Sequence, residues 1–157
     1  MPVKFSNVIF FDKNLTLAES SNGVFLLYGG TLAWRNNNPG NIKWGEFAKK
    51  YGAIGKGAGG HAIFPTYEIG RNAQKKLLFS SEKGYNKLSI KKAMAKYAPT
   101  DDTAANNDPD RYANFVAKKI GTSINTILSD LTEDQQNKMI DAMGKFEGYI
   151  EGEVVYT

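Results

Sequence analysis

The period of the hydrophobic pattern changes near residue 65, and this change constrains the fold more than any other feature of the chain. Before it, short apolar runs are separated by turn residues, and the two clearest runs are 3–11 and 24–28. After it, apolar residues recur every three or four positions. The first pattern favours β-strands and the second favours amphipathic helices. With 157 residues and no long linker, we expect one domain of the α+β class spanning 1–157.

The N-terminal part predicts a small β-hairpin region, and residues 1–30 are a candidate N-terminal β extension. The run Tyr28-Gly29-Gly30-Thr31 is typical of a hairpin turn leading into a strand at 32–34. The glycine-rich segment 44–60 predicts a mobile loop. The segment 59–64 predicts a further strand that enters the core.

Capping residues mark the ends of the expected helices in the C-terminal two thirds. Ser, Thr and Asp accept backbone hydrogen bonds at helix starts, and glycine adopts the left-handed conformation just after helix ends. Four helices are therefore expected: from Thr66 through Leu78, at 90–97 after Ser89, between Asp108-Pro109 and Gly121, and from the capping box at 132–135 to Glu147-Gly148.

The chain has no cysteine and a single histidine, His61, which excludes several kinds of chemistry. Cysteine nucleophiles, disulfides and thiolate metal sites are all absent, and a zinc hydrolase usually needs at least two histidines. We therefore expect no metal and no cofactor. His61 is either a structural histidine or a catalytic one, with the structural reading favoured by its place at the start of an apolar run. Any acid catalysis would then have to come from carboxyl side chains.

The formal net charge is +4, and lysines concentrate it between residues 71 and 96. Such a surface suits a polyanion or is simply a solvated helix face. Because the charge is modest and acids are interleaved, we expect no nucleic-acid partner. The chain contains no apolar run of the roughly 18 residues that a membrane span needs, so we expect no membrane insertion. Residues 1–5 lack the pattern of a signal peptide, so export would need another route.

An asparagine-rich motif stands out in the first third of the chain: Trp34-Arg35-Asn36-Asn37-Asn38-Pro39-Gly40-Asn41-Ile42. Pro39 and Gly40 predict a type II turn, in which Gly40 takes a positive φ. Each asparagine carries both a donor and an acceptor. The motif is therefore either a well-capped turn or a loop that presents amides to a sugar.

The last helix places a carboxyl group on its apolar face. At 100° per residue, Glu147 falls about 20° from Ile140 and about 40° from Met143. Desolvation and the negative end of the helix dipole should both raise the pKa of Glu147. A carboxyl that stays protonated near neutral pH is what glycosidic bond cleavage requires as its general acid. Alternatively, Glu147 turns to solvent or pairs with Arg35 or a lysine.

These motifs resemble, in the same order, those of a known family. The chain is similar to phage-encoded and type VI secretion-associated peptidoglycan-degrading domains marked by Arg-Asn-Asn-Asn-Pro-Gly-Asn. The resemblance covers roughly residues 29 to 152. It implies a lysozyme-like fold, mainly α-helical in its C-terminal two thirds, and muramidase or lytic transglycosylase activity on the β-1,4-glycosidic bonds of peptidoglycan. The segments that carry it are 34–44, 59–65, 97–99, 107–112 and 146–148.

The resemblance also implies catalytic residues. Glu147 matches the family's glutamate, although Gly148 follows directly where many members have Glu-Asn-Gly. The second carboxylate would be Asp101 or Asp102, in a segment where many members have Glu-Asn-Asp-Thr, so the altered spacing weakens that match. Related glucosaminidases place their catalytic glutamate before a comparable loop, which makes Glu19 a rival to Glu147.

A sugar site needs flat aromatic faces together with amide or charged partners. Tyr112 is at a helical spacing that suits the core equally well. The candidate substrate-binding residues are Trp34, Arg35, Asn37, Asn38, Asn41, Trp44, Tyr97 and Tyr112.

The expected role is an antibacterial effector or phage lysin that acts in the periplasm or cell wall of a target bacterium. A cognate immunity protein would be its second partner, besides peptidoglycan itself. The alternative is a non-catalytic component of a phage particle or secretion apparatus that binds peptidoglycan without cutting it.

Overall fold

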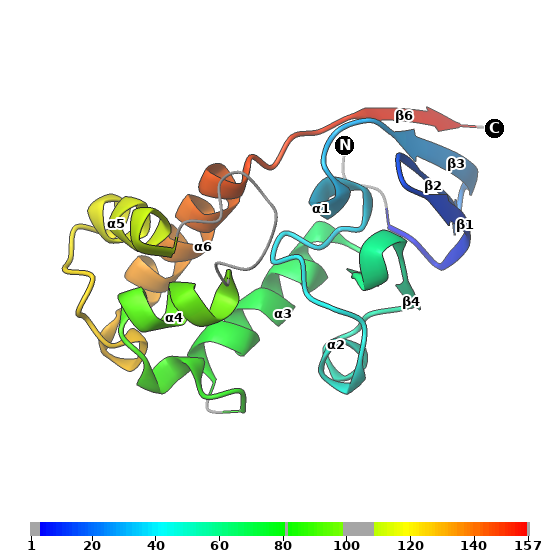
Figure 1. The fold of residues 1–157 in the computed structure, drawn as a ribbon. Helices are drawn as coiled ribbons and strands as arrows, with labels where there is room; N and C mark the ends of the chain where they lie inside the picture. The colour runs from blue at the N-terminus through cyan, green and yellow to red at the C-terminus, as the bar shows by residue number, and fades with distance from the viewer. Residues whose placement is uncertain (1–3, 81, 99–108, 157) are drawn as a thin grey trace. The chain divides into compact units, whose positions relative to one another are not determined.

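The computed structural model describes residues 4–80, 82–98 and 109–156. Within this range the chain forms two compact units. The first, unit 1, comprises Met1–Gln74 and Gly148–Thr157, and the second, unit 2, comprises Lys75–Glu147. Figure 1 follows the chain through both units.

Unit 1 contains an antiparallel sheet of four strands in the order β1-β2-β3-β6. The first three, β1 (Asn7–Asp12), β2 (Leu15–Ser20) and β3 (Gly23–Tyr28), are consecutive in the chain. The fourth, β6 (Glu153–Tyr156), comes from the C-terminal segment and runs beside β3 (Figure 1). The sheet therefore joins segments that are more than 120 residues apart.

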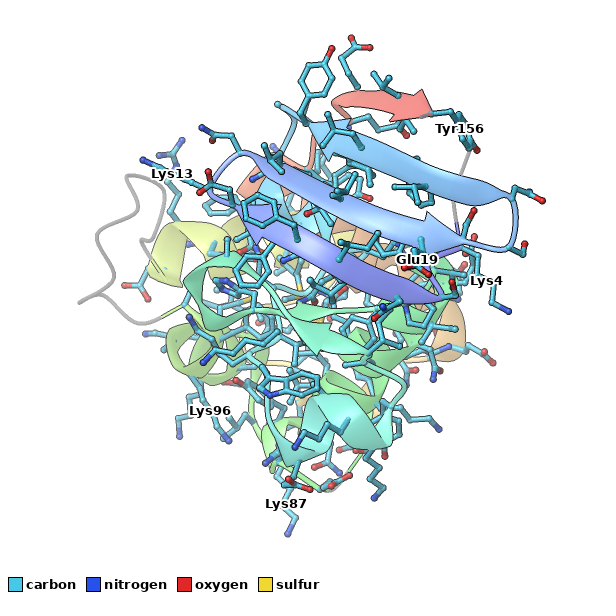
Figure 2. All side chains as sticks on the ribbon, turned by 90° about the vertical axis from the view of Figure 1, so that its right-hand side faces the viewer. Lys4, Lys13, Glu19, Lys87, Lys96 and Tyr156 are labelled. Atoms are coloured by element: carbon cyan, nitrogen blue, oxygen red, sulfur yellow. The ribbon has the colours of Figure 1, made fainter. Side chains whose placement is uncertain are left out.

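Alternation along the strands decides which side chains form the core of unit 1. Successive strand residues point to opposite faces, so Ala18 on β2 and Phe25 and Leu27 on β3 share one face. All three are buried, together with Phe5 and Ile63. On the two outer strands of this sheet, β1 and β6, large apolar side chains are exposed instead, as Tyr156 illustrates in Figure 2.

The hairpin predicted at 28–34 is wrong, because a short helix follows the two glycines. Gly29 and Gly30 have φ values of 68° and 60°, but they lead into α1 (Leu32–Arg35) rather than into a strand. Thr31 caps this helix, since its Oγ1 accepts a hydrogen bond from the Trp34 N–H at 3.4 Å. The same glycines that suit a hairpin turn therefore precede a helix start.

The segment 44–60, predicted as a loop, contains regular structure. It holds α2 (Glu46–Lys50), β4 (Gly55–Lys56) and the 3₁₀ turn η1 (Ala58–Gly60). β4 pairs antiparallel with β5 (Ala62–Ile63), whose two residues are fully buried. The predicted strand that enters the core is therefore confirmed at β5.

Helices make up unit 2. Helix α3 (Tyr67–Phe79) begins in unit 1 and continues into unit 2, where it is followed by α4 (Ile90–Tyr97), α5 (Pro109–Ile120) and α6 (Glu133–Glu147). Helix α5 packs against both α4 and α6. Two 3₁₀ turns, η2 (Tyr85–Lys87) and η3 (Leu128–Asp130), connect the helices. The core residues include Leu78, Met94, Tyr112, Val116, Met139 and Met143.

The predicted caps are confirmed wherever the structure describes them. Ser89 Oγ accepts a hydrogen bond from the Lys92 N–H at 3.2 Å. Thr132 and Gln135 exchange the two hydrogen bonds of a capping box, at 3.0 and 3.2 Å. Gly121 and Gly148 have φ values of 82° and 77°, as expected just after helix ends. Asp108 lies outside the described residues.

The expected lysozyme-like fold is wrong. Among the residues that the structure describes, the fold is mixed α+β with 46% helix and 21% strand, built on a four-stranded antiparallel sheet and a second, two-stranded sheet. The N-terminal region is therefore not a small β-hairpin. The resemblance covered residues 29 to 152, so all four strands of the larger sheet, β1, β2, β3 and β6, lay outside the segments that suggested the fold. No helix in the described ranges has the length and apolar character to cross a membrane.

Two helical glycines give contrasting predictions for stability. A Cβ built on Gly70 in α3 would overlap the carbonyl oxygen of Asn37, whereas one built on Gly144 in α6 would meet no heavy atom within 4 Å. We expect Gly70→Ala to lower the free energy of unfolding by about 3 kcal/mol through steric strain. Gly144→Ala, the matched control, should raise it by about 1 kcal/mol through helix propensity. Urea denaturation followed by circular dichroism measures both, and equal effects of the two substitutions would contradict the prediction.

Candidate functional site

The asparagine motif is an internal part of unit 1. Asn38 is fully buried. Its Nδ2 donates to the carbonyl oxygens of Ile42 and Ala62, both at 2.9 Å, and its Oδ1 accepts from the Ile42 N–H at 3.0 Å. Asn38 thus joins the motif to β5 and offers no surface to a ligand.

Arg35 is also an internal cross-link. It is 4% exposed, and its Nη1 donates to the carbonyl oxygens of Gly29 and Gly30 at 2.6 and 3.1 Å. Its Nη2 donates to the carbonyl oxygen of Lys13 at 2.7 Å. Burial lowers the pKa of Arg35, but a guanidinium stays charged in proteins. Arg35 thereby ties the β1–β2 turn to the β3–α1 connection.

The predicted type II turn at Pro39-Gly40 is wrong in its backbone conformation. A hydrogen bond from the Asn41 N–H to the Asn38 carbonyl oxygen, at 3.0 Å, closes the turn, but Gly40 does not take a positive φ. The left-handed residues are Asn37 and Asn41, with φ values of 51° and 48°. Asparagine tolerates this conformation better than other residues with a side chain. Part of the motif's asparagine content is therefore explained by backbone shape.

A cavity of about 520 Å³ lies within unit 1, next to the asparagine motif. Trp34 and Asn37 line it, so the structure brings together two of the residues expected to bind substrate. Asn37 is held in place because its Nδ2 donates to the carbonyl oxygens of Phe64 and Pro65, both at 3.2 Å. The apolar part of the lining is supplied by Phe5, Leu27 and Val154.

The same cavity is lined by four residues that the sequence analysis missed, namely Tyr67, Glu68, Tyr149 and Glu151. The two tyrosine rings meet edge to face with centroids 5.8 Å apart. The pKa of Tyr149 is raised, first by burial and then by Tyr67, Glu151 and Glu68. The hydroxyl of Tyr149 therefore stays protonated near neutral pH. Tyr67 and Glu68 come from the first turn of α3 and the other two from the segment after α6, so no local motif joins them.

Glu147 lies in unit 2 as the last residue of α6. The expected apolar face is present, since Met139, Ile140 and Met143 are buried, and Glu147 is half-buried. Its Oε2 accepts a hydrogen bond from the Tyr112 hydroxyl at 3.0 Å. The Glu147 carboxyl is therefore oriented by a specific contact.

Tyr112 is a core residue of unit 2 and at the same time the partner of Glu147. Its ring is fully buried and stacks on Phe146 with centroids 4.3 Å apart. Burial raises the pKa of Tyr112, and the charge of Glu147 raises it further. Tyr112 therefore remains a hydrogen-bond donor across the physiological range of pH.

Other candidate substrate residues lie apart from the cavity lining. Trp44 is half-buried in unit 1, and the Lys49 Nζ sits 5.1 Å from the centroid of its ring. Tyr97 belongs to unit 2, where it packs edge to face against Tyr85 with centroids 6.0 Å apart. Asn41 is half-buried beside the turn described above. None of these three lines the cavity.

Of the remaining carboxylate candidates, the structure describes Glu19 alone. Glu19 lies in β2, where it pairs with Asn7 on β1 and Val24 on β3. Its side chain is exposed near the end of the strand, as Figure 2 shows. Asp101 and Asp102 lie outside the described residues.

The described residues offer no group of three or more His, Asp or Glu side chains that could hold a metal ion. The single histidine is used locally, since the His61 Nδ1 lies 3.3 Å from the carbonyl oxygen of Ala58 in the preceding turn. This contact favours the structural interpretation of His61.

No family model matches the chain. The chain is similar to Protein P5 of Pseudoalteromonas phage PM2, with 36% identity over 104 residues. The similar region covers 62% of this chain and 61% of the phage protein.

The buried hydroxyl of Tyr112 predicts a loss of stability at high pH. A tyrosine in the unfolded chain loses its proton near the ordinary pKa of 10.0, whereas folded Tyr112 keeps it. The stabilising effect is complete below pH 10 and is lost as the pH rises further, by about 1.4 kcal/mol per pH unit. Urea titrations at pH 9 and pH 11 should show that Tyr112→Phe reduces this loss, while Tyr28→Phe, at an exposed ring, does not. An unchanged loss in Tyr112→Phe would contradict the prediction.

Proposed function

We propose that this protein cleaves the β-1,4-glycosidic bonds of bacterial peptidoglycan, as a muramidase or a lytic transglycosylase. The observation that carries the proposal is the carboxyl group of Glu147, which ends the apolar face of α6 and is oriented by the buried Tyr112 hydroxyl. A fixed, half-buried carboxyl beside apolar side chains has the surroundings that a general acid needs.

In this mechanism Glu147 gives its proton to the oxygen that links two sugars. The bond between that oxygen and the anomeric carbon breaks, and the oxygen leaves as a hydroxyl group. Water then captures the anomeric carbon in a muramidase, whereas a hydroxyl of the same sugar captures it in a lytic transglycosylase. Glu147 takes the released proton back in either case.

Two influences on the Glu147 proton act in opposite directions. The negative end of the α6 dipole and partial burial favour the protonated acid. The hydrogen bond from Tyr112 favours the ionised carboxylate. Both influences act on the proton that Glu147 donates in the proposed mechanism.

The setting of this activity is proposed from two independent likenesses. The ordered motifs resemble phage and type VI secretion-associated peptidoglycan-degrading domains, and Protein P5, the similar protein, belongs to a phage. The motifs support action on the cell wall of a target bacterium, as a phage lysin or an antibacterial effector, and the similarity to Protein P5 supports a phage setting alone. An effector of this kind would have a cognate immunity protein as its partner.

A non-catalytic peptidoglycan-binding component is the second candidate. The exposed face of α4 favours it, because Lys91, Lys92 and Lys96 are exposed there and suit an anionic polymer. Mass spectrometry of murein incubated with the protein separates the candidates. New reducing or anhydro-sugar ends indicate cleavage, and retention on murein without fragments indicates binding alone.

Glu147→Gln keeps the shape of the side chain but removes the proton that it donates. We expect the rate of murein cleavage to fall by about 10²-fold or more. The measurement is release of soluble fragments from purified murein, identified by mass spectrometry. The masses of the fragments also distinguish hydrolysed from anhydro ends.

Two matched variants accompany Glu147→Gln. Glu133→Gln changes an exposed glutamate at the other end of α6, whose contact with Lys75 at 3.2 Å is a surface ion pair of little energetic weight. Glu19→Gln changes the exposed rival on β2. Both should keep the wild-type rate. A wild-type rate for Glu147→Gln, or a loss confined to Glu19→Gln, would refute the assignment.

Tyr112→Phe should change the pH profile of cleavage. Because Tyr112 stabilises ionised Glu147, its removal keeps the acid protonated to higher pH. The alkaline limb of the rate profile should therefore move to higher pH. Rates measured between pH 4 and 9 test this shift, and a reduced rate with an unmoved alkaline limb would assign Tyr112 a structural role alone.

A further inference from the structure

We infer that the cavity of unit 1 is a saccharide-binding site that holds an N-acetylhexosamine unit between Trp34, Tyr67 and Tyr149. Its volume of about 520 Å³ falls within the roughly 300–1,000 Å³ of small-molecule sites. The carboxylates of Glu68 and Glu151 accept hydrogen bonds from the sugar's hydroxyl and amide groups. The sequence motifs do not point to Tyr67, Glu68, Tyr149 or Glu151.

The rings supply the first part of this recognition. Sugar rings present apolar faces that stack on flat aromatic side chains, while their rims carry hydrogen-bonding groups. Trp34 is half-buried next to the core of unit 1, and Tyr67 and Tyr149 support each other edge to face. Three rings around one cavity therefore offer stacking surfaces that are already in place before a ligand arrives.

The charge of the lining selects the class of ligand. It contains two carboxylates, Glu68 and Glu151, and neither lysine nor arginine contributes to it among the described residues. Within the described parts of the chain, neither carboxylate forms an ion pair or a hydrogen bond with another residue. Anionic ligands such as phosphates would be repelled, whereas neutral donors such as hydroxyl and acetamide groups are accepted.

The segment that carries Tyr149 and Glu151 is fixed against the rest of unit 1. The Thr31 N–H donates to the Ile150 carbonyl oxygen at 2.9 Å, and the Ile150 N–H donates to Thr31 Oγ1 at 3.2 Å. Gly30 and Gly152 meet so closely that a Cβ on either residue would overlap the other's backbone. The cavity is thus preorganised, which reduces the entropic cost of binding.

The choice of N-acetylhexosamine, rather than another neutral sugar, rests on the proposed function. The site itself does not depend on Glu147, because every residue that lines it belongs to unit 1. Binding and cleavage can therefore be tested separately with the full chain.

Isothermal titration with the β-1,4-linked tetramer of N-acetylglucosamine tests binding to the wild-type protein and to Glu147→Gln. We expect both to bind with similar affinity, and the emission of Trp34 to change on binding. A tetramer of galacturonic acid, with similar rings but negative charge, should bind at least tenfold more weakly. Absence of binding by the neutral tetramer at millimolar concentration would overturn the inference, as would equal binding of the two tetramers.

Variants locate the site. Tyr149→Ala should weaken binding of the neutral tetramer about tenfold, which corresponds to roughly 1.4 kcal/mol of stacking. The double variant Glu68→Gln and Glu151→Gln keeps the shape of the lining. It should reduce the difference in binding affinity between the neutral and the acidic tetramer. Glu153→Gln, on β6 and outside the lining, is the matched control and should leave both affinities unchanged. Unaltered selectivity in the double variant would refute the role of the carboxylates.

The two proposals fail in different ways. If the wild-type protein cleaves murein but the Tyr149 and glutamate variants bind and cleave as it does, the saccharide site is wrong and the activity stands. If the neutral tetramer binds and Tyr149→Ala weakens it while no fragments ever form, the site stands and the cleavage activity is wrong.

Discussion

The buried guanidinium of Arg35 is the interaction on which unit 1 most depends. A charged group that is 4% exposed is tolerated because three backbone carbonyls, from Lys13, Gly29 and Gly30, accept its hydrogen bonds. Hydrogen bonds to charged groups contribute about 1.5–3 kcal/mol each, and an unsatisfied partner would cost as much. The contact fixes the chain where it leaves the sheet and enters α1, which in turn positions Trp34 and the asparagines.

The asparagine motif consequently has a different physical role from the one that its composition suggested. The Asn38 Nδ2 donates hydrogen bonds to the backbone carbonyls of Ile42 and of Ala62 in β5. The Asn37 Nδ2 donates to the two carbonyls that precede α3. These bonds bring β5 and the start of α3 to the motif, and Gly70 lets α3 approach the Asn37 carbonyl. The motif therefore holds the elements around the cavity in place. The side chains suited to contact a ligand come mainly from α3 and from the segment before β6.

In unit 2, one hydrogen-bonded pair, Tyr112 and Glu147, lies at the C-terminal end of the apolar face of α6. The Tyr112 hydroxyl is buried and needs a partner, and Glu147 supplies it at the last turn of α6. The same contact orients the carboxyl and influences its proton. A requirement of packing, the satisfaction of a buried hydroxyl, therefore also meets a requirement of the proposed chemistry.

Local signals in the sequence determined the four long helices, α3 to α6, and those of their ends that the structure describes, because capping and periodicity involve residues only a few positions apart. The caps at Ser89 and at 132–135 and the apolar face that includes Glu147 could be predicted for this reason. The tertiary structure alone decided the pairing of β6 with β3 and the meeting of Tyr67 with Tyr149. Those contacts join residues about 80 to 130 positions apart, and they depend on which surfaces can be buried together rather than on any local pattern.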